Sequence, residues 1–279
     1  TVNELPAGWL GKNHAMHLGA ERSRGDWLLF TDADVIFDPS ALRRGIYFAR
    51  TNEIDHLAVA PDCRMEPWLL RAFLIVFMML FTLFLRTWQV RQQRSSAHVG
   101  IGAFNLIRTA VYRGIGGHRP IALRPDDDLK LGKLVKLHGF RQDVAYGRDM
   151  VVVEWYSSVW EMVRGLEKNM FSGTDYRLEV VLFSTSALVM FHVLPFVAMW
   201  FAPAPACWLF AATAVTFWAL ALFAAREMKQ PWSAALGYPL AILLFVCVML
   251  RATILNLWQG GLQWRGTFYS LAELRRNRV

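Results

Sequence analysis

The pattern of hydrophobic and polar positions divides the chain into two parts. Up to residue 172, short apolar runs alternate with helix-like and polar stretches, which predicts an α/β domain of the parallel-sheet kind. After it, three long and mostly apolar segments follow at residues 178–201, 207–225 and 236–257. Each has the length that a helix needs to cross a bilayer, and residues 258–279 then form a basic tail.

A short apolar run, Trp27–Phe30, predicts a strand that is buried on both faces. Thr31, Asp32, Ala33 and Asp34 follow it, so two carboxylates stand at positions i and i+2. Side chains with this spacing at the end of a strand project to the same side. Because clustered carboxylates repel each other unless a cation joins them, Asp32 and Asp34 are candidate ligands of a hard divalent ion. A strand–turn–helix junction whose acids only cap and face solvent is the alternative.

Residues 66–93 contain a further apolar stretch, with about 14 uncharged residues, fewer than the roughly 20 that span a bilayer. A crossing here would also place the acids before and after it on opposite faces of the membrane. We therefore expect residues 66–93 to lie in the membrane interface, and residues 156–171 to form a second interfacial helix.

Two further segments combine an unusual composition with candidate chemistry. Gly100 and Gly102 indicate that a ligand or another backbone approaches closely there. Three consecutive acids at residues 126–128 then open a helix that ends near Gly139. The helix dipole favours acids at this position, so capping is the simpler interpretation. One cap needs only one acid, however, and the run is therefore our candidate for a general base.

Lys12 stands near the start of a helical pattern that runs to Arg24, directly after the turn-rich sequence L-P-A-G-W-L-G. A lysine and the free backbone N–H groups of a helix N-terminus can together hold phosphate. Taken alone, the motif is also typical of a surface lysine that follows a tight turn.

Composition and charge narrow the function classes. Of the 279 residues, 55% are hydrophobic, and the formal net charge of +8 suits anionic lipid head groups and a nucleotide diphosphate. Nucleic acid is not an expected partner, because the basic residues are not interleaved with aromatics in a soluble module. The three cysteines lie far apart, so neither a disulfide framework nor a zinc site follows from them.

The basic residues also predict an orientation in the membrane. Arg226 and Lys229 lie between the second and third apolar segments, which favours a cytoplasmic loop and, with it, a cytoplasmic acidic part. The basic tail favours the same side, but three crossings would place it on the opposite one. The sequence alone leaves this conflict open.

Five motifs follow one another along the first part of the chain: G-W-L-G-K at residues 8–12, T-D-A-D at 31–34, G-A-F-N-L-I-R at 102–108, I-G-G-H at 115–118 and D-D-D-L-K-L-G at 126–132. With them, residues 1–172 resemble membrane-anchored family 2 glycosyltransferases, in particular the ceramide glucosyltransferase-like and hopanoid-associated members. The resemblance implies a partial GT-A (Rossmann-like) α/β domain followed by transmembrane helices. We expect an N-terminally incomplete domain, because the family's first half-domain, which reads the nucleotide base, has no counterpart here.

The resemblance also implies how the donor is held. Asp32 and Asp34 match the D-x-D motif that binds Mg²⁺ or Mn²⁺ and the diphosphate of a sugar nucleotide. Lys12 matches a lysine near that diphosphate. The family's Q/R-x-x-R-W signature is absent, and Lys168 or Arg164 is expected to supply its positive charge.

For the chemistry itself, the resemblance points to the acidic run. Asp128 matches the general base that deprotonates the acceptor hydroxyl, and Asp127 stands where the family usually has glutamate. The resemblance places two segments beside donor sugar and acceptor, Gly102–Asn105 and Gly116–His118, with Gly102, Asn105 and Gly117 as the candidate site residues.

The implied function is an inverting glycosyltransferase that moves a sugar from a nucleotide-diphosphate sugar, with UDP favoured, to a lipid acceptor in glycolipid biosynthesis. We expect a multi-pass protein of the cell membrane with its catalytic part in the cytoplasm. Two alternatives stay open: a polyprenyl-phosphate or glycan glycosyltransferase, and a non-enzymatic membrane transport or scaffold protein. Transporters usually carry functional polar residues within their spans, whereas here the acids cluster outside them.

Overall fold

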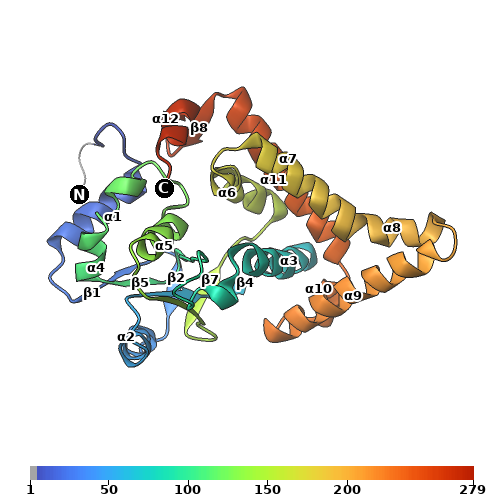
Figure 1. Cartoon of the computed structure of the whole chain (residues 1–279), viewed down its shortest axis with the longest axis horizontal. Coiled ribbons are helices and arrows are strands. Elements are labelled where there is room, and N and C mark those ends of the chain that lie inside the picture. Colours follow the sequence, from blue (N-terminus) through green and yellow to red (C-terminus); the bar gives the residue numbers. More distant parts are fainter. Residues whose placement is uncertain (1–4) are drawn as a thin grey trace. The chain divides into compact units, whose positions relative to one another are not determined.

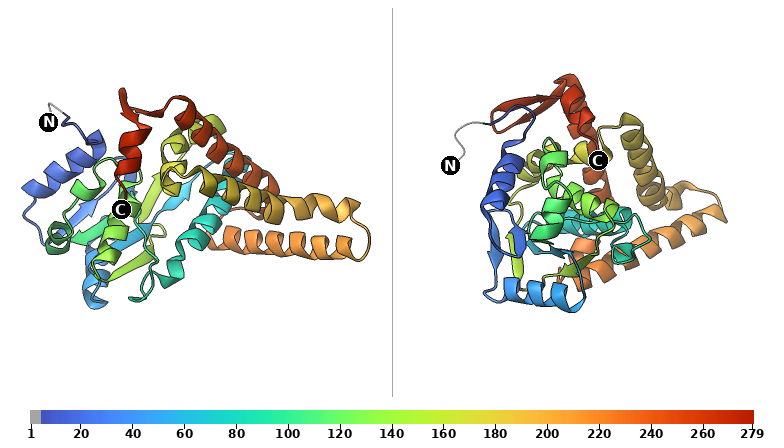
Figure 2. Two further views of the ribbon diagram at one scale, coloured as in Figure 1. Left: turned by 45° about the horizontal axis from the view of Figure 1, so that its top comes forward. Right: turned by 60° about the vertical axis from the view of Figure 1, so that its left-hand side comes forward.

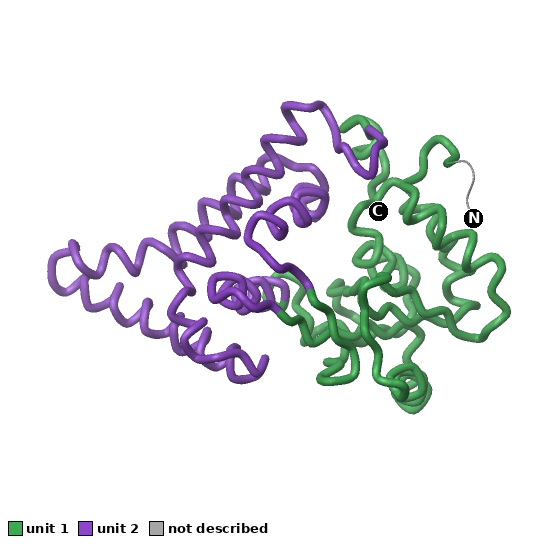
Figure 3. The backbone as a smooth tube through the Cα atoms, turned by 180° about the vertical axis from the view of Figure 1, so that it is seen from behind, with its two compact units in different colours: residues 1–64, 82–154, 269–279 green, residues 65–81, 155–268 purple. Residues whose placement is uncertain are grey.

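The computed structural model describes residues 5–279 (Figure 1). These residues divide into two compact units. Unit 1 takes the chain up to Arg64 and again over Thr82–Glu154 and Tyr269–Val279, and unit 2 takes Met65–Phe81 and Trp155–Phe268 (Figure 3). The chain therefore leaves unit 1 twice and returns to it twice.

Unit 1 contains two sheets, both of mixed strand direction. The larger has the order β1 (Trp27–Phe30), β5 (Asn105–Arg108), β3 (His56–Ala60), β6 (Gln142–Tyr146), and the smaller the order β2 (Val35–Phe37), β7 (Val151–Glu154), β4 (Asp62–Arg64). β5 runs antiparallel to both of its neighbours, whereas β6 runs parallel to β3. In the smaller sheet, β7 runs antiparallel to β2 and parallel to β4.

The α/β class is confirmed, but two details of the sheet prediction are wrong. The sheets are mixed rather than parallel, because a short apolar run does not encode the direction in which its strand enters a sheet. The strand Trp27–Phe30 is not buried on both faces: only Leu28 is buried, and the other three residues are half-buried. Within residues 5–279 this strand pairs with β5 alone, so one of its edges carries no further strand.

Three helices pack on the larger sheet through one hydrophobic cluster. They are α1 (Gly11–Arg22), α4 (Thr109–Gly114) and α5 (Asp127–Leu137). Their buried residues Ala20, Val111 and Leu131 meet Leu28 of β1 and Ile107 of β5 in this cluster. α5 starts at the acidic run and stops before Gly139, whose φ of +77° fits the predicted helix end. The remaining elements of unit 1 are α2 (Ala41–Thr51) and the 3₁₀ turns Thr87–Gln89 and Arg119–Ile121.

The apolar stretch within residues 66–93 forms α3 (Trp68–Leu85), and the turn Thr87–Gln89 follows after Arg86, whose φ is +50°. Together they have 22 residues and a mean hydropathy of 2.3, so they are long and apolar enough to cross a membrane. The argument that this stretch is too short to span a bilayer is therefore wrong, because the helix extends beyond its uncharged part. The interfacial position itself stays a prediction.

Unit 2 consists mostly of helices, beginning with α6 (Val159–Met170), whose first turn is capped by Ser158. α7 (Leu178–Leu188), a π-helical turn (Val189–Val193) and α8 (Leu194–Phe201) follow each other as one long helix, and α9 (Ala206–Glu227) returns alongside α8 (Figure 2). The 3₁₀ turn Ser172–Thr174 precedes α7, and the short α10 (Trp232–Ala235) precedes α11 (Tyr238–Trp258).

Four helices among residues 5–279 are long and apolar enough to cross a membrane. Besides Trp68–Gln89, they are Leu178–Phe201, Ala206–Glu227 and Tyr238–Trp258. The three apolar segments after residue 172 therefore each coincide with one helix of the length that we expected.

The basic tail is folded. β8 (Gly261–Trp264) and β9 (Thr267–Ser270) form a hairpin, and α12 (Leu271–Arg276) then starts with a capping box. After α12, Asn277 binds the loop that precedes the acidic run, within unit 1. Its Oδ1 accepts from the Leu123 N–H at 3.0 Å, and its Nδ2 donates to the Pro120 carbonyl at 2.8 Å. The end of the tail, Tyr269–Val279, thus belongs to the same folded body as the acidic run.

Candidate active site

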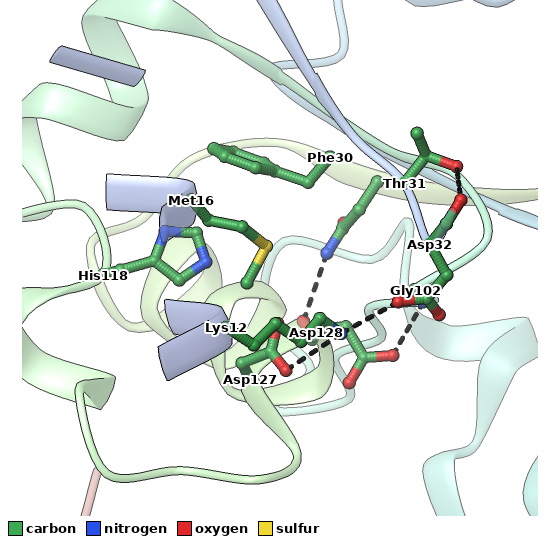
Figure 4. Close-up of a pocket in the computed structure, with 10 residues that line it drawn as sticks. Lys12, Met16, Phe30, Thr31, Asp32, Gly102, His118, Asp127 and Asp128 are labelled. Atoms are coloured by element: carbon green, nitrogen blue, oxygen red, sulfur yellow. Dashed lines mark hydrogen bonds and ion pairs between the residues drawn. The ribbon is translucent and has the colours of Figure 1, made fainter. Parts of the chain in front are cut away.

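Side chains from five segments of unit 1 meet at one pocket (Figure 4). The segments are α1, the end of β1 with the turn after it, the glycine loop with β5, the loop before Arg119–Ile121, and the first turn of α5. They come together because β1 and β5 are neighbours, with Phe30 opposite Asn105. The lining residues are Lys12, Met16, Phe30, Thr31, Asp32, Gly102, Asn105, His118, Asp127 and Asp128.

Lys12 joins the D-x-D segment to α5. Its Nζ lies 3.0 Å from Asp32 Oδ1 and 3.3 Å from Asp127 Oδ1. The Asp32 side chain is 46% exposed and the Asp127 side chain 4%, so these charges run from the surface into the interior. Burial by itself lowers the pKa of the Lys12 ammonium, but attraction to the neighbouring carboxylates outweighs it and raises that pKa above its usual value. Lys12 is therefore a fixed positive charge in the pocket.

The three consecutive acids have three different partners. Asp126 forms two bonds of 2.9 Å each with the buried Arg124, and Asp127 pairs with Lys12. Asp128 instead accepts hydrogen bonds from the backbone. Asp126 is the N-cap residue of α5 but makes no capping bond with its side chain. Helix capping therefore does not account for the run.

The Asp128 carboxylate is held at both oxygens. Oδ2 accepts from the Gly102 N–H at 2.7 Å, and Oδ1 from the Leu129 N–H at 2.8 Å. The Gly102 carbonyl in turn accepts from the Asp32 N–H at 2.8 Å, so one loop residue connects the two acids. Burial raises the pKa of the Asp128 carboxyl, against the attraction of Lys12. A carboxylate with a raised pKa is the stronger proton acceptor.

The two glycines of the loop permit the close approach that the sequence predicted. A Cβ on Gly100 would lie 1.7 Å from the backbone oxygen of Asp128, and one on Gly102 would lie 2.5 Å from Asp32 Oδ2. The neighbour is thus a helix backbone at the first position and a carboxylate at the second.

Gly117 does not line the pocket, but it directly precedes His118, which does. Its φ is +58°, and a Cβ there would lie 2.8 Å from the Tyr112 ring. The Tyr112 hydroxyl lies 2.7 Å from His118 Nδ1. Because burial lowers the pKa of His118 to about 3, this lining residue is neutral at physiological pH. The predicted contact of Gly117 with the donor stays a prediction.

The structure brings some of the other predicted residues to the pocket and leaves others away from it. Asp34 is exposed in the turn after β1 and is not a lining residue. Lys168 belongs to α6 in unit 2, where its Nζ lies 5.2 Å from the centroid of the Trp264 ring. Asn105 does line the pocket, but it is 1% exposed, and its Nδ2 donates to the Asp128 carbonyl at 3.4 Å.

The sequence analysis missed three lining residues. Met16 lies one helical turn after Lys12, so the i, i+4 spacing could have identified it. Phe30 and Thr31 directly precede Asp32 at the end of β1, whereas His118 belongs to the expected segment Gly116–His118 and does line the pocket. The three missed residues stood within the motifs or one turn away from them.

The donor set fits a divalent cation that is shared with a phosphate ligand. Among residues 5–279, no group of three or more His, Cys, Asp or Glu side chains could hold a metal by itself. Mg²⁺, however, is commonly bound by one or two carboxylates together with substrate phosphates. Asp32 offers an exposed carboxylate that already has a cation, the Lys12 ammonium, beside it. Three carboxylates face one ammonium among the lining residues, which also favours binding of a cation.

Residues 2–172, more than half of the chain, match the family model for glycosyltransferase like family 2. The chain belongs to this family. All of the lining residues fall within the matched range of the family 2 glycosyltransferase domain. Its function is accordingly glycosyl transfer, from a nucleotide-sugar donor to an acceptor, and family 2 glycosyltransferases commonly use divalent metals. No curated protein matches the sequence.

Proposed function

We propose that this family 2 glycosyltransferase is an inverting enzyme that moves a sugar to a lipid acceptor at the membrane surface. The observation that carries the proposal is the arrangement of Asp128, Asp32 and Lys12. A carboxylate fixed by two backbone N–H groups shares one pocket with an exposed carboxylate and a fixed ammonium. These are the groups that a base-assisted displacement of a diphosphate requires.

Asp128 is the general base in this proposal. The acceptor hydroxyl oxygen bonds to the anomeric carbon, the bond from that carbon to the diphosphate oxygen breaks, and Asp128 takes the hydroxyl proton. Its two backbone hydrogen bonds orient the carboxylate, and its raised pKa strengthens it as a proton acceptor. Attack on the face opposite the leaving diphosphate inverts the configuration at the anomeric carbon.

Asp32, Asp34 and Lys12 hold the donor diphosphate in this proposal. Asp32 and Asp34 would bind Mg²⁺ or Mn²⁺, and such an ion neutralises the charge that develops on the departing diphosphate. Lys12 adds the protein's own positive charge. The lining side chains leave only about 10 Å³ between them, so we place the diphosphate above the cluster at its exposed Asp32 edge. We favour a UDP-sugar as the donor.

A lipid acceptor is supported by the apolar helices. Four helices of membrane-crossing length and composition belong to the same chain as the catalytic pocket. An acceptor dissolved in the membrane would meet an enzyme that is held at the membrane surface. The ceramide glucosyltransferase-like and hopanoid-associated enzymes are the subgroups that we propose, with glycolipid biosynthesis as the setting.

We propose that α3 lies in the interface and does not cross. The residues before and after it form one body, because β3 precedes α3 and pairs with β5 and β6, which follow it. Asp32 and Gly102, also on either side of α3, are joined by a backbone hydrogen bond. A folded body of this kind lies on one side of a bilayer. We therefore keep residues 66–93 and 156–171 as interfacial helices of a catalytic domain that spans residues 1–172.

The experiment that tests this function measures release of UDP from UDP-sugars by the protein in membranes. UDP-glucose, UDP-galactose and UDP-N-acetylglucosamine are the donors, with Mg²⁺ or Mn²⁺ and then with excess EDTA. We expect turnover of at least one donor, its loss in EDTA, and its loss in the Asp32→Ala variant. Folded protein that turns over no nucleotide sugar, with a broader panel of bases included, would refute the proposal. Analysis of the product then separates a lipid acceptor from a polyprenyl phosphate or a glycan.

A further inference from the structure

Three polar side chains form a buried row behind the acids, and the mechanism above does not use them. They are His56, Asn105 and Gln142, the first residues of β3, β5 and β6, and at most 1% of each is exposed. His56 lies beside Gln142 in the parallel register, and Asn105 lies opposite Ala58, two positions along β3. Alternate residues of a strand share one face, so all three side chains point to the same side of the sheet.

The hydrogen bonds of this row run in one direction. Gln142 Nε2 lies 2.6 Å from His56 Nδ1, and His56 Nε2 is in turn hydrogen-bonded to Asn105 Oδ1. Because an amide nitrogen only donates, His56 Nδ1 accepts, and the ring proton is on Nε2, which donates to Asn105. Because Asn105 Oδ1 accepts from His56, the amide nitrogen of Asn105 points toward Asp128. It donates to the Asp128 backbone carbonyl at 3.4 Å. One imidazole thereby sets the orientation of the amide.

The row also ties together the two segments that hold the Asp128 carboxylate. At one end, Gln142 accepts from the Val99 N–H at 2.9 Å and donates to the Gly132 carbonyl of α5 at 3.1 Å. At the other end, Asn105 reaches the first turn of α5. The segment after Val99 carries Gly102, which donates to Asp128 Oδ2. Both partners of that bond are therefore anchored to the same row.

The protonation state of His56 does not change near physiological pH. Burial lowers its pKa to about 4, so the ring stays neutral at physiological pH and keeps one pattern of donor and acceptor. No other side chain of the row titrates. A neutral, fully buried imidazole with both nitrogens bonded is a fixed link.

We propose that His56 is a positioning residue of the transferase: through Asn105 it holds the first turn of α5 so that the Asp128 carboxylate keeps its angle to the reacting hydroxyl. Asn105 then serves the base and not the donor sugar. This inference rests on the proposed function of Asp128 as general base. The competing interpretation is that the row only satisfies buried polar groups and stabilises the fold.

Two substitutions at one position separate these interpretations. The amide of asparagine reaches about as far as Nδ1 of histidine, so His56→Asn keeps the bond to Gln142 and loses the donor to Asn105. Glutamine reaches about as far as Nε2, so His56→Gln restores that donor. Leu57→Ala is the matched control, because Leu57 is 1% exposed, follows His56 and points to the opposite face of the sheet.

The first readout is turnover of the UDP-sugar that the wild-type protein accepts. We expect His56→Asn to lower kcat about tenfold or more, with KM for the UDP-sugar within about twofold, since misplacement of a catalytic group acts on the chemical step. His56→Gln should recover most of kcat. Leu57→Ala should keep kcat within about threefold at an equal or larger loss of Tm. Equal losses of kcat in His56→Asn and Leu57→Ala at equal Tm, or no recovery in His56→Gln, would overturn the proposal.

The second readout does not depend on activity. Hydrogen exchange of the amides of Gly102 and Leu129, the two donors to Asp128, should be faster in His56→Asn than in Leu57→Ala or His56→Gln. Unchanged exchange in His56→Asn would refute the link from His56 to the acid. If the wild-type protein turns over no sugar nucleotide, the proposed function fails, and the exchange comparison still decides whether His56 positions Asp128.

Discussion

Three adjacent aspartates in one helix turn would ordinarily repel one another, and each of them here meets a different counterpart. Asp126 has the Arg124 guanidinium beside it, Asp127 shares the Lys12 ammonium with Asp32, and Asp128 is held by backbone donors. Burial raises the pKa of the Asp127 carboxyl to about 7 against the attraction of Lys12, but Asp128 is the acid that two backbone N–H groups orient, and we therefore expect Asp128 to take the proton of the substrate.

At the residue scale, we expect Asp128→Asn to abolish transfer while the protein stays folded. Asparagine has nearly the shape of aspartate but cannot take the hydroxyl proton, so kcat should fall by a factor of about 10² to 10⁴. UDP release from membranes and thermal unfolding are measured side by side. Asp26→Asn, at an exposed acid before β1, is the control and should keep full activity. Full activity in Asp128→Asn would show that Asp128 is not the base.

At the element scale, the site depends on how closely the glycine loop lies on α5. Gly100 contacts the backbone of the first turn of α5, and the backbone of Gly102 binds both Asp32 and Asp128. A loop at this distance leaves no room for a Cβ at its first glycine. The geometry of the two acids is therefore built into backbone packing and not only into side chains.

We expect Gly100→Ala to displace the loop and cost about 3 kcal/mol of stability or more, because its methyl group would meet a backbone oxygen 1.7 Å away. Activity should fall with it, since the Gly102 N–H moves away from Asp128. Gly19→Ala in α1 is the matched control: nothing lies within 4 Å of its added Cβ, and alanine should stabilise that helix by about 1 kcal/mol. Urea unfolding in detergent compares the two. A Gly100→Ala protein as stable as the wild type would contradict the close packing.

What the sequence revealed of these elements was local in character. The strand Trp27–Phe30, the start of α5 at the acids and its end before Gly139 all follow from residues within one turn or one strand. The direction of β5 and the row of His56, Asn105 and Gln142 depend on which strands become neighbours, and no single segment encodes that. The length of α3 was misjudged because Arg71 was counted against a helix that continues through it to Trp68.

At the scale of the whole molecule, the course of the chain limits its membrane topology. Unit 1 includes residues on both sides of the helical stretch Trp155–Phe268, and Asn277 is hydrogen-bonded beside the acidic run. One folded body lies on one side of a bilayer, so we expect this stretch to cross an even number of times. The conflict in the sequence, between a basic tail on the cytoplasmic side and three crossings, is removed if one of the three long helices does not cross.

α11 is the helix that we expect to stay on the catalytic side. Its Arg251 forms an ion pair of 2.7 Å with Glu167 of α6, and a charged residue within a span is costly. By contrast, α8 and α9 form a hairpin joined by the uncharged residues Ala202–Pro205, a natural turn on the far side. The long helix Leu178–Phe201 and α9 would then be the two crossings, and the loop after α9 with its basic residues would be cytoplasmic.

Single cysteines in a background without the three natural ones test this topology with a maleimide that cannot cross the membrane. In intact cells, Ala204→Cys should react, whereas Arg226→Cys, Gln259→Cys and Arg278→Cys should react only after permeabilisation. Arg43→Cys, on α2 of unit 1, is the reference for the catalytic side. Labelling of the tail position but not of this reference in intact cells would mean that the chain crosses an odd number of times. Labelling of Gln259→Cys in intact cells would contradict the expectation that α11 stays on the catalytic side.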